Sequence, residues 1–246
     1  MENRIYRKGW EFFLFLFLLA GWLVQARASD DFGFWGSVSA EKKLYKGLGA
    51  SFEGEFRSRD NVRTVERWSV SAGLSYKLTN WLKISSDYIF IHYYHPMEVT
   101  RKGNYVPEFW QPRHRVNFSL TGKYEVVKRL TFSLRERWQY TYRPERSTGE
   151  RMDDEIVKGK GKNNLRSRLQ VEYDIPKCSF TPYASCELTH YLHSGFYYEK
   201  TRWIVGTEWK LSKRQGLDFY YLYQSHADEE ESNGHVVGIK YSFKFK

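Results

Sequence analysis

Residues 68–78, which read WSVSAGLSYKL, decide the fold, and they are followed by a tight turn at Thr79-Asn80. Every second residue from Trp68 to Leu78 is apolar or aromatic, and the residues between them are Ser, Gly and Lys. A period of two is that of a β-strand with one apolar and one polar face. We therefore expect a strand here whose two faces meet different surroundings.

The same alternation recurs along most of the chain. It is clear at residues 34–41 and 50–57, and it predicts further strands at 81–94, 113–124, 130–142, 164–173, 178–191, 201–211, 216–224 and 235–245. Together with residues 68–78, these segments make eleven strands. Bacterial single-chain outer-membrane barrels, however, have an even number of strands. We therefore expect ten or twelve: either the first strand lies outside the closed barrel, or an irregular strand near the N-terminus adds one.

The predicted connections alternate in length. Short turns at 79–80, 125–129, 174–177 and 212–215 separate longer loops at 95–112, 143–163, 192–200 and 225–234. Short turns on one side and long loops on the other are typical of outer-membrane barrels, and strands of about 10 residues match a tilted membrane crossing. The sequence thus predicts an all-β, transmembrane antiparallel β-barrel of about 10–12 strands over residues 29–246, with both termini periplasmic.

Aromatic residues support this orientation of the strands. They make up 18% of the chain, and pairs such as Trp68 with Tyr76 and Trp203 with Trp209 mark opposite ends of one apolar stripe. Trp and Tyr collect at the two membrane interfaces, so we interpret these residues as two aromatic girdles. The alternative is a soluble barrel whose core holds the aromatic rings. The low mean hydropathy of −0.66 is compatible with a membrane barrel, because only alternate residues need to face lipid.

The first 28 residues are expected to be a signal peptide. A basic start at residues 4–8 precedes an apolar run at 12–24 and a small-residue site at 26–28, which predicts cleavage after Ala28. The apolar run is shorter than the roughly 20 residues of a membrane-spanning helix. Trp22 stands where a lipoprotein signal would need Cys. The predicted location is the outer membrane of a Gram-negative cell.

The two cysteines, Cys178 and Cys186, fall in one predicted strand and on the same face. At about 3.3 Å per residue they would be roughly 26 Å apart, beyond the reach of a disulfide. We expect two free structural thiols.

If the apolar faces meet lipid, the alternate positions place many charged side chains in the lumen. The lumen-lining candidates are Arg57, Arg67, Arg115, Arg135, Arg137, Arg166, Arg168, Arg202, Glu53, Glu55, Glu172, Glu187 and Glu208. Lys77, Lys83, Asp87, Lys123, Lys210, Asp218 and Lys240 share this face. Two interpretations stay open: a salt-bridged core that closes the lumen, and a narrow passage biased toward anions such as acidic sugars.

Two residues break the pattern. Glu136 falls on the apolar face between Leu134 and Trp138, and a bulge that turns it inward is the expected explanation. Pro182 cannot donate a ladder hydrogen bond, so it predicts a bulge or a local edge in its strand.

Catalytic patterns are weak. No His has Ser two positions later, which is the spacing that would place both on one strand face, and the adjacent His193-Ser194 would point to opposite faces. Asp153-Asp154 with His193 or His226 would form an acidic site only by coincidence. We expect no catalytic residue, but an outer-membrane hydrolase of lipid or peptide remains an alternative. A barrel whose outer loops bind a surface lipoprotein or glycan is another.

No cofactor or metal site is expected. The acidic run at 228–231 lacks the spaced ligands of a dedicated calcium loop and is interpreted as a solvated loop. The formal net charge of +10 does not indicate nucleic-acid binding, because the basic residues are spread over alternate strand positions. The expected partners are membrane lipid and lipopolysaccharide, small anions or acidic sugars, and the barrel-assembly machinery during insertion.

Several segments resemble a known family. They are residues 113–118 (RHRVNF), 165–169 (LRSRL) leading to 173–175 (YDI), 181–183 (TPY) and the C-terminal 238–245 (GIKYSFKF). Together they resemble the outer-membrane β-barrel family known as domain of unknown function 2490. The resemblance implies a barrel in the outer membrane over nearly all of the mature chain and implies no catalytic residue. Outer-membrane barrels usually end on an aromatic residue, whereas in this chain Lys246 follows Phe245.

Overall fold

The computed structural model describes residues 31–99, 105–147, 156–193, 195–227 and 233–245. The predicted signal peptide and the acidic run at 228–231 lie outside these ranges. Within the described ranges no helix has the length and apolarity needed to cross a membrane.

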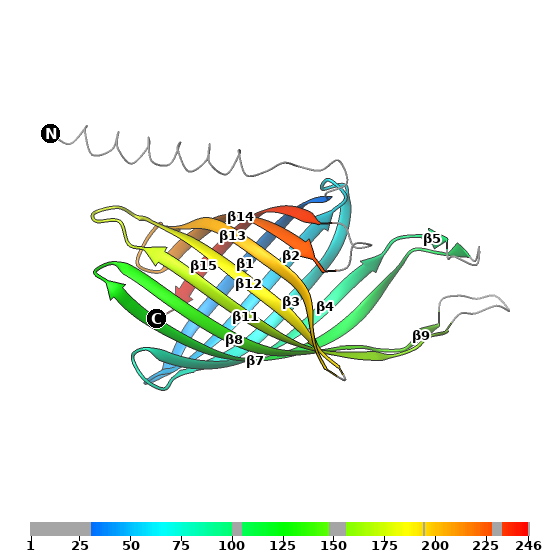
Figure 1. The fold of residues 1–246 in the computed structure, drawn as a ribbon, viewed down its shortest axis with the longest axis horizontal. Coiled ribbons are helices and arrows are strands. Elements are labelled where there is room, and N and C mark those ends of the chain that lie inside the picture. Colours follow the sequence, from blue (N-terminus) through cyan, green and yellow to red (C-terminus); the bar gives the residue numbers. More distant parts are fainter. Residues whose placement is uncertain (1–30, 100–104, 148–155, 194, 228–232, 246) are drawn as a thin grey trace. The chain divides into compact units, whose positions relative to one another are not determined.

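Eleven strands form one closed barrel, as Figure 1 shows. They are β1 (Asp31–Tyr45), β2 (Leu48–Arg59), β3 (Thr64–Lys77), β4 (Leu82–His95), β7 (Phe109–Val127), β8 (Leu130–Arg143), β11 (Lys160–Tyr173), β12 (Phe180–Leu192), β13 (Phe196–Lys210), β14 (Gln215–His226) and β15 (Gly234–Phe245). Two small hairpins, β5 (Glu98–Val99) with β6 (Tyr105–Val106) and β9 (Arg146–Ser147) with β10 (Ile156–Val157), belong to connections between barrel strands. The predicted antiparallel barrel of 10–12 strands is confirmed.

The expectation of an even strand number is wrong. β1 lies inside the closed sheet, where it pairs with β2 in the antiparallel sense and with β15 in the parallel sense, from Asp31 opposite Gly234 to Lys42 opposite Phe245. A meander reverses direction at every turn, so the last of eleven strands runs the same way as the first. Asp31 and Phe245 therefore lie at opposite rims, and the expectation that both termini lie on one side is also wrong.

The connections define two rims. The short-turn rim holds residues 46–47, 78–81, 128–129, 174–179 and 211–214. The long-loop rim holds the described connecting residues 60–63, 96–99, 105–108, 144–147, 156–159, 193, 195, 227 and 233. The predicted long loop at 192–200 is wrong, because β13 already begins at Phe196. Cys178 lies in the connection before β12 rather than in the strand, and both cysteines are free.

The two faces of the wall differ as the alternation predicts. On β3, Val70 and Leu74 point outward and are 37% and 55% exposed, whereas the inward Ser69 is 5% exposed. Trp203 on β13 is 56% exposed, and Glu187 on β12 is 2% exposed. Apolar side chains thus cover the outside of the barrel and polar side chains fill the inside, which is the reverse of a soluble barrel.

The two irregular residues behave differently from each other. The ladder around Glu136 is regular, with Leu120 and Ser167 directly opposite, so the predicted inward bulge is wrong. Glu136 stays on the outer face, where its Oε2 accepts a hydrogen bond of 2.7 Å from Ser167 Oγ. Pro182 pairs with Thr207 of β13 but lies beyond the last residue of β12 that pairs with β11. The missing N–H therefore falls at a local edge, one of the two predicted explanations.

Two tyrosines lie over glycines inside the barrel. Tyr220 of β14 is opposite Gly238 of β15, and a Cβ on Gly238 would be 2.0 Å from the Tyr220 ring. Tyr183 of β12 is opposite Gly206 of β13, where a Cβ would be 2.7 Å from the Tyr183 hydroxyl. A ring covering a glycine fills the space that the missing side chain leaves, and it fixes the register of both strands.

We expect the substitution Gly238→Ala to destabilise the barrel by about 1–3 kcal/mol, because the new methyl group overpacks the Tyr220 ring. The urea midpoint of unfolding, followed by tryptophan fluorescence in detergent, measures the effect. Gly54→Ala is the matched control, since a Cβ there meets no atom within 4 Å. Equal midpoints for the two variants would contradict this packing account, as would failure of Tyr220→Ser to relieve the effect of Gly238→Ala.

Candidate functional site

The interior of the barrel contains two cavities. The larger, of about 1490 Å³, is lined by residues of the short-turn rim such as Gly47 and Arg214. The smaller, of about 540 Å³, is lined by residues near the long-loop rim such as Asp31 and His226. The side chains that line both cavities are Trp35, Arg57, Arg67, Arg115, Arg166 and Arg202. We call this layer the septum, because it separates the two cavities.

One carboxylate of the septum region is Glu55 on β2. It accepts two hydrogen bonds of 2.9 Å from Nε and Nη2 of Arg57, and a third of 3.0 Å from Nη2 of Arg67 on β3. The Arg57 guanidinium also lies 3.4 Å from the centroid of the Trp35 ring. The paired bonds and the ring contact hold Arg57 in one orientation inside the lumen.

The other carboxylate is Glu187 on β12, which is 2% exposed. Its Oε1 accepts hydrogen bonds from Arg166 of β11, the shorter at 2.5 Å, and its Oε2 accepts one of 3.1 Å from Nη2 of Arg135 on β8. Arg202 of β13 lies 3.6 Å from Oε1 and donates its Nε to Gln224 Oε1 at 2.7 Å. A single buried carboxylate therefore holds three arginines from three strands.

Further arginines around the septum have hydroxyl partners. Arg115 donates its Nε to Thr141 at 3.0 Å, Arg137 donates to Ser119 at 3.0 Å, and Arg168 donates to Ser185 at 3.3 Å. Among the described residues no carboxylate lies within ion-pair distance of these three side chains. The middle of the lumen thus carries more positive than negative charge, with Glu55 and Glu187 as the carboxylates in contact with its arginines.

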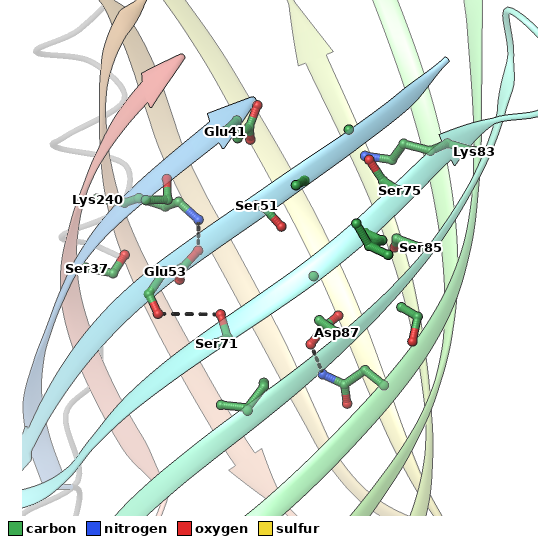
Figure 2. Close-up of a pocket in the computed structure, with 18 of the residues that line it drawn as sticks. Ser37, Glu41, Ser51, Glu53, Ser71, Ser75, Lys83, Ser85, Asp87 and Lys240 are labelled. Carbon is green, nitrogen blue, oxygen red and sulfur yellow. Dashed lines mark hydrogen bonds and ion pairs between the residues drawn. The ribbon is translucent and has the colours of Figure 1, made fainter. Parts of the chain in front are cut away.

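The wall formed by β1 to β4 carries small polar side chains, as Figure 2 shows for Ser37, Ser51, Ser71, Ser75 and Ser85. Glu53 on this wall forms an ion pair with Lys240 of β15, and Asp87 accepts a hydrogen bond of 2.6 Å from Asn117 Nδ2. Because serines occupy little volume, this wall leaves open the space into which the arginines of the opposite wall extend.

A small apolar cluster lines the remaining wall. It comprises the buried side chains of Tyr183, Ile204, Leu222 and Val236, with Trp35 and Tyr220 packed against it. Tyr183 donates its hydroxyl to Asp218 at 3.0 Å. The interpretation of the aromatic residues as girdles at the membrane interfaces does not predict these inward rings. Trp35 alternates in phase with Ser37 and Ser39, and that phase was the signal that could have placed it inside.

Most of the predicted lumen residues line the two cavities. Of the thirteen candidates, Arg57, Arg67, Arg115, Arg135, Arg137, Arg166, Arg168, Arg202, Glu53, Glu55 and Glu187 line one or both cavities. Glu172 and Glu208 line neither: Glu172 forms an ion pair with Lys123 at 3.3 Å, and Glu208 is exposed near the end of β13. Lys77, Lys83, Asp87, Asp218 and Lys240 line the larger cavity, whereas Lys210 pairs with Asp174 at 3.1 Å.

The described part of the chain contains no group of three or more His, Cys, Asp or Glu side chains that could hold a metal ion. Asp153-Asp154, Ser194 and the acidic run at 228–231 lie outside the described residues. What the described interior offers chemically is guanidinium groups, which bind and orient anions.

The fold and the site define a class: a closed β-barrel with an apolar outside and an arginine-rich lumen. The family model described as "Protein of unknown function (DUF2490)" matches residues 32–235, so the chain belongs to this family. The predicted resemblance is thereby confirmed. No curated protein matches the sequence significantly.

Solved structures share the barrel fold. The β domain of the Bordetella autotransporter BrkA is 13% identical with a TM-score of 0.56, and the match covers 82% of this chain and 83% of that chain. The translocator domain of the autotransporter NalP from Neisseria meningitidis is 11% identical with a TM-score of 0.52, over 75% of this chain and 71% of that chain. At these identities the similarity is one of fold.

We expect Glu187→Gln to destabilise the barrel by about 3–5 kcal/mol, because it removes the carboxylate that compensates three buried arginines. Urea unfolding in detergent measures the change. Glu208→Gln is the control, and as an exposed substitution it should shift stability by no more than about 0.5 kcal/mol. A loss for Glu187→Gln as small as that of the control would show that the septum does not depend on this ion-pair cluster.

Proposed function

We propose that this chain is an integral outer-membrane β-barrel whose lumen is a narrow, anion-biased passage with the septum as its constriction. The outward apolar side chains support the membrane location, since a water-soluble barrel would bury them. The fold shared with two autotransporter barrel domains agrees with it. In this proposal the signal peptide is cleaved after Ala28.

The orientation follows from the connections. Bacterial barrels keep short turns on the periplasmic side and longer loops outside, so the short-turn rim is periplasmic in this proposal. Phe245 then lies at the periplasmic rim, and Asp31 at the outer rim. Lipid and lipopolysaccharide surround the barrel, and the barrel-assembly machinery inserts it.

The observation that carries the proposed selectivity is the surplus of arginine at the septum. Arg115 belongs to the septum, and Arg137 lies directly opposite the septum residue Arg166. Arg115, Arg137 and Arg168 have hydroxyl partners and no described carboxylate within ion-pair distance. Fixed positive charge at a constriction attracts anions and repels cations. Small anions and acidic sugars are the proposed cargo, because guanidinium groups pair with carboxylate in a planar, two-bond geometry.

Closure of the passage depends on the ion pairs of Glu55 and Glu187. Glu55 holds arginines of β2 and β3, and Glu187 holds arginines of β8, β11 and β13, in two clusters on the inner wall. A permanently closed septum would make the barrel structural, with no conductance. A septum whose arginines exchange their partners would let anions pass one at a time.

Planar-bilayer recording in a salt gradient tests the proposal. We expect a small conductance whose reversal potential shows anion preference. The double substitution Arg115→Ser with Arg137→Ser should lower the permeability ratio by roughly fivefold, the effect of ~1 kcal/mol of Coulomb energy. Glu208→Gln should leave it unchanged. Absence of conductance would contradict the passage, and cation preference would contradict the role of the arginines.

A further inference from the structure

Four arginines form a compact group on two neighbouring strands. Arg135 and Arg137 lie on β8, Arg166 and Arg168 lie on β11, and the ladder places Arg137 directly opposite Arg166 and Arg135 directly opposite Arg168. Side chains opposite each other in a sheet have Cβ atoms about 5 Å apart, and those two positions apart along a strand are separated by about 7 Å. We call these residues the arginine quartet.

Such an arrangement opposes folding. Like charges directly opposite each other are destabilising, and the quartet contains two such pairs in succession. Glu187 forms ion pairs with Arg135 and Arg166, but it also pairs with Arg202, which lies outside the quartet. Arg137 and Arg168 donate to the neutral hydroxyls of Ser119 and Ser185, and the buried Nε of Arg135 has no hydrogen-bond partner.

The quartet faces open space. All four side chains line the larger cavity of about 1490 Å³, whose opposite wall carries the serines of β1 to β4. At the short-turn rim the same cavity is lined by Lys42, Lys43, Lys46, Lys213 and Lys244. A mouth lined by lysines raises the local concentration of anions and directs them inward.

We propose that the arginine quartet is the binding site of a compact multivalent anion of the phosphoryl type, which enters from the short-turn rim. This inference deepens the proposed function and rests on it in one respect, that the lumen admits anions. Glu187 is the one described carboxylate paired with the four guanidinium groups, so several positive charges stay uncompensated. A phosphoryl group carries more negative charge than a single carboxylate and compensates them better. The site takes water-borne phosphoryl groups, because the barrel wall separates it from the lipid.

Isothermal titration of the purified mature barrel in an uncharged detergent tests the site. The probes are pyrophosphate, acetate and a trigalacturonate at equal ionic strength. We expect saturable binding of pyrophosphate that raises the unfolding temperature, and no saturable binding of acetate. Pyrophosphate binding no tighter than acetate would overturn the site, and a tighter trigalacturonate would overturn the phosphoryl assignment.

Single substitutions separate binding from structure. Arg137→Gln and Arg168→Gln should each weaken pyrophosphate binding at least about tenfold. They should leave the ligand-free unfolding temperature unchanged or raise it, since each removes a like-charge pair. Arg59→Gln, which changes an arginine of the other cavity, should leave binding unchanged. Lower stability with unchanged binding would show that the quartet is structural and would overturn the proposal.

Different results would overturn the anion passage and the quartet as a binding site. An anion-selective current without saturable pyrophosphate binding would overturn the quartet as a site and leave the passage. Pyrophosphate binding without any current would overturn the passage and leave the site.

Discussion

The parallel pairing of β1 with β15 is the constraint on which the rest of the structure depends. In a membrane every backbone N–H and C=O must be paired within the protein, so a sheet can cross only as a closed barrel. With eleven strands, closure requires one parallel pair, and this pair runs from Asp31 to Lys42 on β1. Closure with this pair also places Asp31, at the start of β1, and Phe245, at the end of β15, at opposite rims. Every inward side chain is then part of one enclosed lumen.

Inside the closed barrel, ion pairs supply part of the stability that apolar packing supplies in the core of a soluble protein. Inward aromatic rings cover glycines on one side, and Glu55 and Glu187 hold arginines from five strands in the middle. Removing either carboxylate would leave buried charges unpaired, so the stability of the barrel depends on Glu55 and Glu187. The surplus of arginine is harder to explain by stability alone, because like-charge pairs such as Arg137 with Arg166 weaken the sheet. The proposed role toward anions accounts for their presence.

Local pattern predicted most of the fold. The period of two at residues 68–78 and in the other strands follows from two chemically different faces, so strand positions and inward charges could be derived from the sequence. The parallel seam could not, because it depends on how the first and last strands meet. Neither could the sharing of Glu187 among Arg135, Arg166 and Arg202, which depends on register and side-chain length. Glu136 shows the limit of pattern: a polar residue on the outer face pairs with Ser167 there instead of turning inward.

The central claim is that neighbouring residues of one strand face lipid and an aqueous lumen, and a spin label tests it most directly. Single cysteines at Val70 and Ser71, introduced after Cys178→Ser and Cys186→Ser, place a label on either face of β3 in reconstituted membranes. Power-saturation electron paramagnetic resonance compares their contact with oxygen, which concentrates in lipid, and with a water-soluble nickel complex. The account predicts that oxygen relaxes the label at position 70 and nickel relaxes the label at position 71. The reverse pattern would contradict it, because the apolar face would then line the interior.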